Sequence, residues 1–317
     1  MAETRVFREG DEDAIVSLWN RRVSGCYATG PLSVEEFSTS VLGKQYFDAD
    51  GLVLALEKGR AVAFAHAGFR SEDWVGPDFA RGTISMVAAE EDCMDAGQAT
   101  VAGAVRYLFG KGARQVEAFT IAFPNQPFYN CLYGGELAGM DEEHPAGLDL
   151  MKWCGFNISS CTLIMVSDLR DEAPPPRTFN GLQLRVGPEK SKVLGLRPSA
   201  CYGIPERIRR ASLFDSAGVD KAGVTFWHLD RCNHSTGDHL AAISNVGVAE
   251  ELRGSGAGEV VMREAHRILL SEGARATGLG VNGTNGRAVG FYRKVGYRPF
   301  RPAYSFHLDW RHYGDYR

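Results

Sequence analysis

The stretch that most constrains this chain runs from Ile243 to Leu270 and joins a strand-like segment, a glycine-rich turn and a helical segment. The turn reads Arg253-Gly254-Ser255-Gly256-Ala257-Gly258, and apolar residues then recur three and four positions apart, which predicts a helix. Glycines let the backbone approach a ligand closely, and the free N–H groups at a helix start attract anions. Arg253 adds a cation suited to phosphate. We therefore expect an anion-binding turn, with an ordinary glycine-rich connection as the alternative.

Two common phosphate-binding patterns do not fit this turn. A P-loop requires Gly-Lys-Ser/Thr, and no such triplet follows. A dinucleotide fingerprint requires its glycines directly after the strand, whereas Ala249 to Arg253 separate Val248 from the first glycine.

The spacing Arg253-x-x-Gly256-x-Gly258 resembles the pyrophosphate loop of the GCN5-related N-acetyltransferases (GNATs). A second block downstream is similar to the family pattern Asn-x-x-Ala-x-x-Phe-Tyr-x-x-x-Gly-Phe/Tyr and consists of Asn285, Ala288, Phe291, Tyr292, Gly296 and Tyr297. The two blocks stand in the family's order and cover residues 243–297. The resemblance implies an α/β (α+β) fold with a mixed, largely antiparallel central sheet flanked by helices, and acetyl-CoA as cosubstrate.

The element order β-α-β-β-β-α-β, which the resemblance implies, is expected twice. In the first half we expect helices at 11–23 and 96–111 and strands at 5–7, 52–57, 62–69, 83–87 and 115–121. In the second half we expect strands at 182–186, 224–229 and 240–248 and a helix at 206–213. That leaves fewer strands between 187 and 240 than the family has.

A spacing of 161 residues relates the two halves, since it separates Gly112-Ala113 from Gly273-Ala274. The same spacing places Asp92 under Arg253 and Asp95 under Gly256, so the first copy carries carboxylates that repel a pyrophosphate. Met151, which cannot donate a proton, stands in the place of Tyr292.

We expect two tandem acyl-CoA N-acyltransferase (GNAT) domains, a degenerate one at 1–168 and a cofactor-binding, catalytic one at 178–317. The boundary falls in the charged and proline-rich segment 168–180. The alternative is a single domain with a chance similarity.

Roles for individual residues follow from the resemblance. The strand ending at Val248 would hold the pantetheine arm, with amides near Val246 and Val248 facing the thioester. Gly247 suits a bulge that opens a slot for the arm, or else tight packing. The expected cofactor-binding residues are Val246, Gly247, Val248, Arg253, Gly254, Ser255, Gly256, Ala257, Gly258 and Asn285.

Tyr292 is the expected general acid, because a phenol remains protonated at neutral pH and can donate to the departing thiolate. The alternative is an aromatic anchor for its helix. Asn285 either caps that helix or contacts the cofactor arm.

The general base is left open among Asp238, His239, His228, Glu250 and a water chain. His228, His234 and His239 have no ligand spacing typical of zinc, so we expect no metal. The cationic run Glu206-Arg207-Ile208-Arg209-Arg210 either draws an acidic acceptor or forms a solvated helix face.

Composition limits the partners. The net charge of −4 gives no support for nucleic acid, and no apolar stretch is long enough to span a membrane. Seven cysteines without a C-x-x-C pair indicate reduced thiols and a cytoplasmic location. We therefore expect a small-molecule amine acceptor and N-acetylation by direct attack, while the oligomeric state is not set. The alternative is a non-catalytic regulatory or scaffold protein that binds CoA thioesters.

Overall fold

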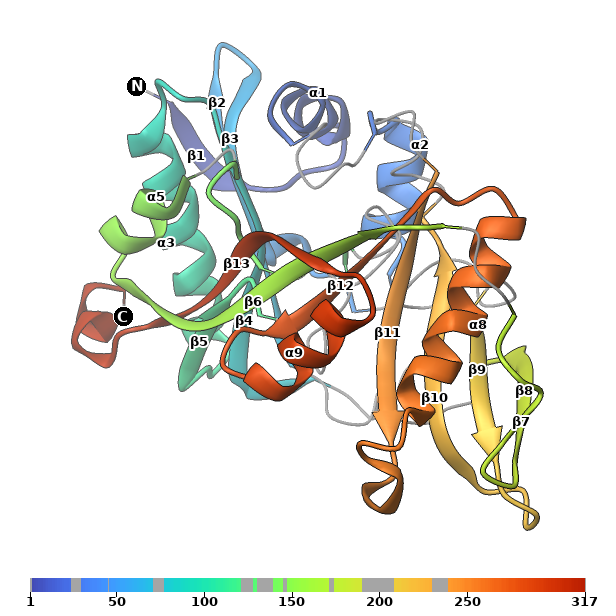
Figure 1. Ribbon diagram of the computed structural model, residues 1–317. Helices are drawn as coiled ribbons and strands as arrows, with labels where there is room; N and C mark the ends of the chain where they lie inside the picture. Colours follow the sequence, from blue (N-terminus) through green and yellow to red (C-terminus); the bar gives the residue numbers. More distant parts are fainter. Residues whose placement is uncertain are drawn as a thin grey trace. The chain divides into compact units, whose positions relative to one another are not determined.

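The computed structural model describes residues 2–23, 30–44, 46–70, 77–120, 128–129, 139–144, 147–170, 174–189, 208–229 and 239–316. The chain forms two compact units (Figure 1). Unit 1 comprises residues 1–162 and 302–317, and unit 2 comprises residues 163–301. The expected ranges, 1–168 and 178–317, differ from these units, chiefly because residues 302–317 group with unit 1. Chain position alone does not reveal this grouping.

Unit 1 orders its strands β1-β2-β3-β4-β5-β13-β6. From β1 to β13 neighbouring strands pair antiparallel, except β4 and β5, which are parallel. The bounds are β1 Glu3–Val6, β2 Leu52–Glu57, β3 Arg60–Arg70, β4 Asp78–Ala89, β5 Gln115–Ala118, β6 Phe156–Asp168 and β13 Arg298–Leu308. Its helices are α1 Glu12–Arg22, α2 Val34–Phe37, α3 Met94–Gly110 and α5 Gly147–Trp153. A π-helical turn, Ser38–Leu42, and a 3-10 turn, Ala49–Gly51, also belong to it. The expected strands and helices of this half are confirmed with shifted ends.

Strands β6 and β13 each contribute to both units. Residues 156–162 of β6 and 302–308 of β13 belong to unit 1, and residues 163–168 of β6 and 298–301 of β13 belong to unit 2. Each unit thus completes its sheet with part of a strand that continues in the other unit.

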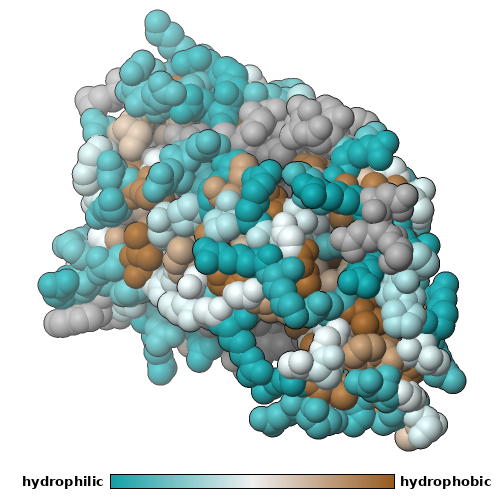
Figure 2. Space-filling view, viewed as in Figure 1, coloured by the Kyte–Doolittle hydropathy of each residue, from teal (hydrophilic) through white to brown (hydrophobic). Residues whose placement is uncertain are grey.

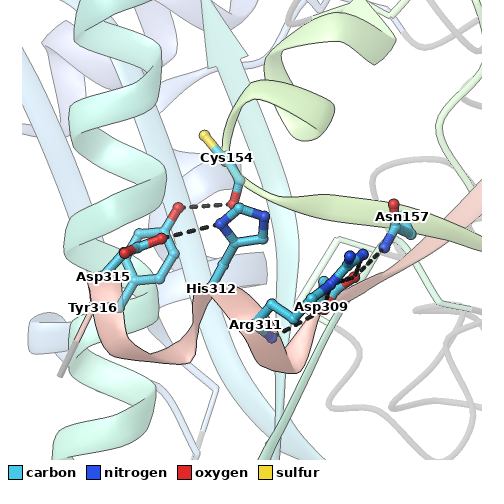
Figure 3. A network of polar contacts seen from close by, with 7 residues as sticks. All are labelled: Cys154, Asn157, Asp309, Arg311, His312, Asp315 and Tyr316. Atoms are coloured by element: carbon cyan, nitrogen blue, oxygen red, sulfur yellow. Dashed lines mark hydrogen bonds and ion pairs between the residues drawn. The ribbon is translucent and has the colours of Figure 1, made fainter.

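The segment after β13 anchors unit 1 at the corner between α5 and β6 (Figure 3). It forms a 3-10 turn, Trp310–Asp315. Asp309, which precedes the turn, accepts a hydrogen bond from Asn157 Nδ2 at 3.0 Å. The Tyr316 hydroxyl donates to the Cys154 carbonyl at 2.8 Å. Hydrogen bonds from Arg311 are the largest cause of the lowered pKa of Asp309, so this carboxylate stays charged.

Unit 2 orders its strands β6-β12-β11-β10-β9-β8-β7. The bounds are β7 Thr178–Phe179, β8 Leu182–Pro188, β9 Arg209–Phe214, β10 Asp220–His228, β11 Leu240–Val248 and β12 Ala276–Asn282. Its helices are α8 Ala257–Ser271 and α9 Gly286–Lys294, with a 3-10 turn at Glu250–Leu252. Helix α8 lies over strands β9, β10 and β11 (Figure 1) and buries Val260, Val261 and Ala265 against them.

The helix expected at 206–213 is wrong, because Arg209–Phe214 is strand β9. Ala211 and Leu213 are buried on the α8 side, which is the alternation of a strand. Strand β9 pairs with both β8 and β10 and supplies a strand that was missing from the second half. The cationic run is therefore no solvated helix face, since Arg209 pairs with Glu272 and Arg210 with Asp220. Glu206 and Arg207 lie outside the described residues.

Figure 2, seen from the same side as Figure 1, shows a largely hydrophilic surface with hydrophobic residues in small areas. Within the described part of the chain, the helices are all too short or too polar to cross a bilayer.

Candidate functional site

The glycine turn of unit 2 has the backbone that its sequence predicts. Gly254 and Gly256 have φ of +80° and +97°, a region that residues with a side chain rarely adopt. Gly256 is the residue before α8 and has no side chain that could cap the first N–H groups of the helix, which lie at its positive end. Ser255 Oγ accepts from the Ala257 N–H at 3.3 Å and donates to the Leu252 carbonyl at 2.7 Å. These two hydrogen bonds fix the turn at the start of α8.

Three elements converge at Gly258, in the first turn of α8. A Cβ placed there would lie 3.1 Å from the Phe291 ring of α9 and 3.3 Å from Val248 Cγ2 at the end of β11. Only glycine permits this close approach without a shift of its neighbours. The turn, the strand that leads to it and the helix that carries Tyr292 are thus packed into one place.

Strand β11 contains a bulge, but not at the glycine expected to form it. Gly223 of β10 pairs with Gly247, and Thr225 pairs with Ser244, so Asn245 and Val246 together oppose one residue. Asn245 is the distorted position, with φ of +47°. Gly247 is regularly paired, and a Cβ there would meet nothing within 4 Å, so tight packing within the described residues is not its reason.

Strand β11 also separates from its other neighbour. The parallel register between β11 and β12 joins Leu240 to Ala276 and ends, within the described residues 239–316, at Ala242 and Gly278. Both strands continue beyond that pair, β11 for six residues and β12 for four. The edge of β11 from Ile243 to Val248 is therefore released from the ladder on the β12 side.

Tyr292 is half-buried on α9, with its ring 5.4 Å from Phe291 and 5.9 Å from Tyr297. Burial raises its pKa above the ordinary value of about 10, so the phenol is protonated throughout the physiological range. Its hydroxyl has no hydrogen-bond partner among the described residues. By contrast, the buried Tyr297 hydroxyl hydrogen-bonds Thr277 Oγ1 at 2.7 Å and His266 Nε2 at 2.9 Å. Tyr292 is the tyrosine of this pair that is left free to donate.

The remaining expected residues occupy different surroundings. The side-chain oxygen of Asn285 accepts from the Ala288 N–H at 3.1 Å, which is the capping interaction. Arg253 lies exposed at the turn, 3.7 Å from the Glu250 carboxylate.

Most of the residues suggested as a base are poorly placed. His228 pairs with Ala241, at the opposite end of β11 from the turn, and hydrogen-bonds Glu272 at 2.9 Å. His239 is exposed before β11 begins, and Glu250 is exposed in the 3-10 turn. Asp238 and His234 lie outside the described residues. The described residues include no group of three His, Cys, Asp or Glu side chains arranged to hold a metal ion.

The structure adds a hollow of about 910 Å³ in unit 2 that sequence reasoning missed. It lies against the sheet face opposite α8, beside the β11 bulge. Its lining residues include Glu189, Arg210, Ser212, Asp220, Asn245 and Gly247. No local motif marks Glu189, because its partner Thr225 is 36 residues away in sequence.

Unit 1 repeats the scaffold of this site without its turn. Gly97 of α3 packs against Leu150 as Gly258 packs against Phe291, and both pairs have the expected spacings. Gly112 and Gly273 end their helices with φ of +105° and +100°. However, Asp95 lies inside α3, where unit 2 has its left-handed glycine, and Met151 is fully buried. In addition, strand β4, which precedes α3 as β11 precedes α8, stays paired with β5 as far as Ile84 and Ala118.

Comparison with known proteins agrees with this geometry. The family model described as "Acetyltransferase (GNAT) family" matches residues 222–297, which hold β10, β11, the turn, α8, β12 and α9. This part of the chain is a GNAT family domain.

A mycothiol acetyltransferase from Saccharomonospora viridis is 27% identical over 179 residues, which are 49% of this chain. The match spans 58% of that relative's length.

Two solved structures resemble almost the whole chain. A GNAT from Sphaerobacter thermophilus has a TM-score of 0.62 at 16% identity, with 96% of this chain and 95% of that chain covered. A tandem GNAT protein from the clavulanic acid biosynthesis pathway has a TM-score of 0.64 at 15% identity, with 97% and 98% covered. At these identities the likeness establishes the fold, a mixed α/β fold with mostly antiparallel sheet flanked by helices.

Proposed function

We propose that unit 2 transfers the acetyl group of acetyl-CoA to the amine of a small-molecule acceptor. The observation that carries this proposal is the convergence at Gly258, where Phe291 and Val248 both lie within 3.3 Å of the same Cβ position. It brings an anion-binding turn, a released strand edge and a tyrosine-bearing helix to one place. The mycothiol acetyltransferase relative supports acetyl transfer, and its name does not fix the acceptor of this chain.

In this proposal the pyrophosphate of acetyl-CoA lies on the turn from Arg253 to Gly258, with the Arg253 guanidinium nearby. The N–H groups of Arg253 and Ser255 already bond the Glu250 and Leu252 carbonyls, so the glycine N–H groups of the turn are the donors. The pantetheine arm adds to the edge of β11 that β12 has left, as an extra strand would. The amides of Val246 and Val248 face the thioester, and the missing side chain of Gly247 leaves space beside them. Asn285 contributes through its amide nitrogen, because its oxygen caps α9.

The chemistry needs a donor for the carbonyl and a donor for the sulfur. A neutral amine attacks the thioester carbon, and a backbone N–H stabilises the oxyanion. The C–S bond then breaks, and Tyr292 donates its proton to the departing sulfur. The product CoA is a thiol at neutral pH. The attacking nitrogen loses a proton, which passes through water to the Tyr292 phenolate and restores the phenol. The hollow beside the bulge holds the acceptor.

Unit 1 serves as a degenerate acetyltransferase domain that keeps the fold and has lost the cofactor turn. Asp92 and Asp95 would repel a diphosphate, and Met151 has no proton to donate. The described cysteines, Cys93, Cys154 and Cys161, are free, which agrees with a reducing, cytoplasmic location.

The test is release of CoA thiol from acetyl-CoA by the purified chain in the presence of pooled amines, with mass spectrometry to identify the acetylated product. The proposal predicts amine-dependent release that falls sharply in Tyr292→Phe. Binding of acetyl-CoA without transfer to any amine would instead favour the regulatory or scaffold role.

A further inference from the structure

Arg210 of β9 reaches across the sheet of unit 2 to the β11 bulge. Its side chain lies on the face opposite α8 and is 20% exposed. Nε donates to Asp220 Oδ2 at 2.9 Å, and Nη1 donates to the Asn245 carbonyl at 3.0 Å. The guanidinium passes directly over Gly223 of β10, where a Cβ would lie only 2.5 Å from Nη2. Glycine at 223 is therefore what lets Arg210 reach β11.

A buried carboxylate lies near the same guanidinium nitrogen that bonds the Asn245 carbonyl. The Glu189 side chain is 1% exposed and lies 4.0 Å from Arg210 Nη1. It accepts a hydrogen bond from the Thr225 hydroxyl, which also accepts from Arg210 at 3.3 Å. A buried charge of this kind needs a paired, hydrogen-bonded partner, so the guanidinium has little freedom to move.

The Asn245 carbonyl is the group that this arrangement orients. Asn245 is left-handed, and its buried side-chain Nδ2 has no hydrogen-bond partner among the described residues, so none of them holds the bulge through that nitrogen. A peptide unit is planar and trans, so the Asn245 C=O and the Val246 N–H point in opposite directions. With the carbonyl turned toward Arg210, on the β10 side, the Val246 N–H points toward the edge that β12 has left.

We propose that Arg210 is a positioning residue, which holds the Asn245–Val246 peptide so that the Val246 N–H is aimed at the acetyl carbonyl. This inference rests on the proposed function. In this role Arg210 orients the Val246 N–H, which is the oxyanion donor, and does not itself bind CoA.

The matched pair of variants is Arg210→Lys and Arg185→Lys. Both arginines line the same hollow on the same face, but Arg185 hydrogen-bonds Gln183 and stacks on Phe214 at 5.5 Å, without reaching β11. Lysine keeps the charge, yet a single ammonium cannot bond Asp220, Thr225 and the Asn245 carbonyl in the fork geometry of Arg210. Loss of an oxyanion donor costs about 10²–10³ in kcat, so a misdirected one should cost about 10- to 100-fold.

Two readouts test the proposal. The first is the infrared carbonyl band of isotope-labelled acetyl-CoA, which should move to lower frequency on binding to the parent and to Arg185→Lys, and should move much less in Arg210→Lys. The second is kinetic, with kcat reduced in Arg210→Lys and the affinity for free CoA kept within about twofold. If Arg210→Lys is not folded by circular dichroism, Asp220→Asn loosens the same guanidinium and should reduce the band shift in the same sense.

An equal band shift and an equal kcat in a folded Arg210→Lys would overturn the positioning role. A parent that does not bind acetyl-CoA would instead overturn the proposed function itself, so the two failures can be told apart.

Discussion

Replacing Tyr292 by phenylalanine removes one hydroxyl and leaves the ring contacts with Phe291 and Tyr297 in place. Because that hydroxyl has no partner among the described residues, no buried donor or acceptor is left unsatisfied. We therefore expect the free energy of unfolding to change by less than about 0.5 kcal/mol. Acetyl-CoA affinity should also stay within about twofold, since the proton donation is needed only as negative charge builds on sulfur.

The expected loss appears in turnover. General acid assistance is worth about 10² to 10⁴ in rate, or roughly 3 to 5 kcal/mol of transition-state stabilisation. Steady-state thiol release with a working amine measures kcat, and calorimetry measures the affinity for acetyl-CoA.

Tyr297→Phe is the matched control for this prediction. It deprives Thr277 and His266 of a buried hydrogen-bond partner. That variant should lose about 1–3 kcal/mol of stability and keep most of its turnover. A fall in kcat of less than threefold in Tyr292→Phe, with unchanged affinity, would refute the general acid role.

Two further predictions concern stability. Burial lowers the pKa of His66 and His144 to about 3, so below about pH 6.5 the unfolded chain binds protons that the folded chain does not. The free energy of unfolding should therefore fall as the pH drops from about 6.5 to 4, by roughly 1 kcal/mol per pH unit for each histidine. Urea unfolding measured across this range should show a weaker pH dependence for His66→Gln than for the parent. An unchanged pH dependence would contradict the low pKa of His66. Truncation after Leu308 removes the Asn157–Asp309 and Tyr316–Cys154 hydrogen bonds and the ring contact of Tyr313 with Phe109. Unit 1 should lose about 2–4 kcal/mol in urea unfolding, and full stability of the truncated chain would show that this segment does not anchor it.

The parts of the fold that could be predicted depend on local signals. The turn at Arg253–Gly258, the helix after it and the strands of unit 1 follow from glycine spacing and apolar periodicity within short windows. The sequence of β9 predicts a helix instead of a strand, because both faces of the strand carry arginine. Arg209 lies on the α8 side with its guanidinium 4.9 Å from the Phe226 ring, and Arg210 lies on the other side. A strand is recognised by the alternation of polar and apolar residues, and this alternation is lost from the sequence when both faces carry charged residues.

What could not be predicted arises from contacts between distant segments. The bulge lies at Asn245 and not at Gly247, and the Asn245 carbonyl accepts a hydrogen bond from Arg210, 35 residues earlier in the chain. Glu189 meets Thr225 only once β8 and β10 have taken their places beside β9. The grouping of residues 302–317 with unit 1 depends on pairing between Phe306 and Ala118, which no local pattern encodes.

One acetyl-CoA should bind per chain, on the glycine turn of unit 2. Isothermal titration calorimetry of the full chain with acetyl-CoA measures this stoichiometry, with Gly256→Asp and Gly256→Asn as a matched pair. Asparagine tolerates the left-handed backbone at this position, and aspartate of the same size adds a negative charge beside the pyrophosphate. We predict a stoichiometry of about one for the parent, retained binding for Gly256→Asn and no detectable binding for Gly256→Asp. Two equivalent sites per chain, or equal affinity in the parent and Gly256→Asp, would show that the turn of unit 2 is not the binding site.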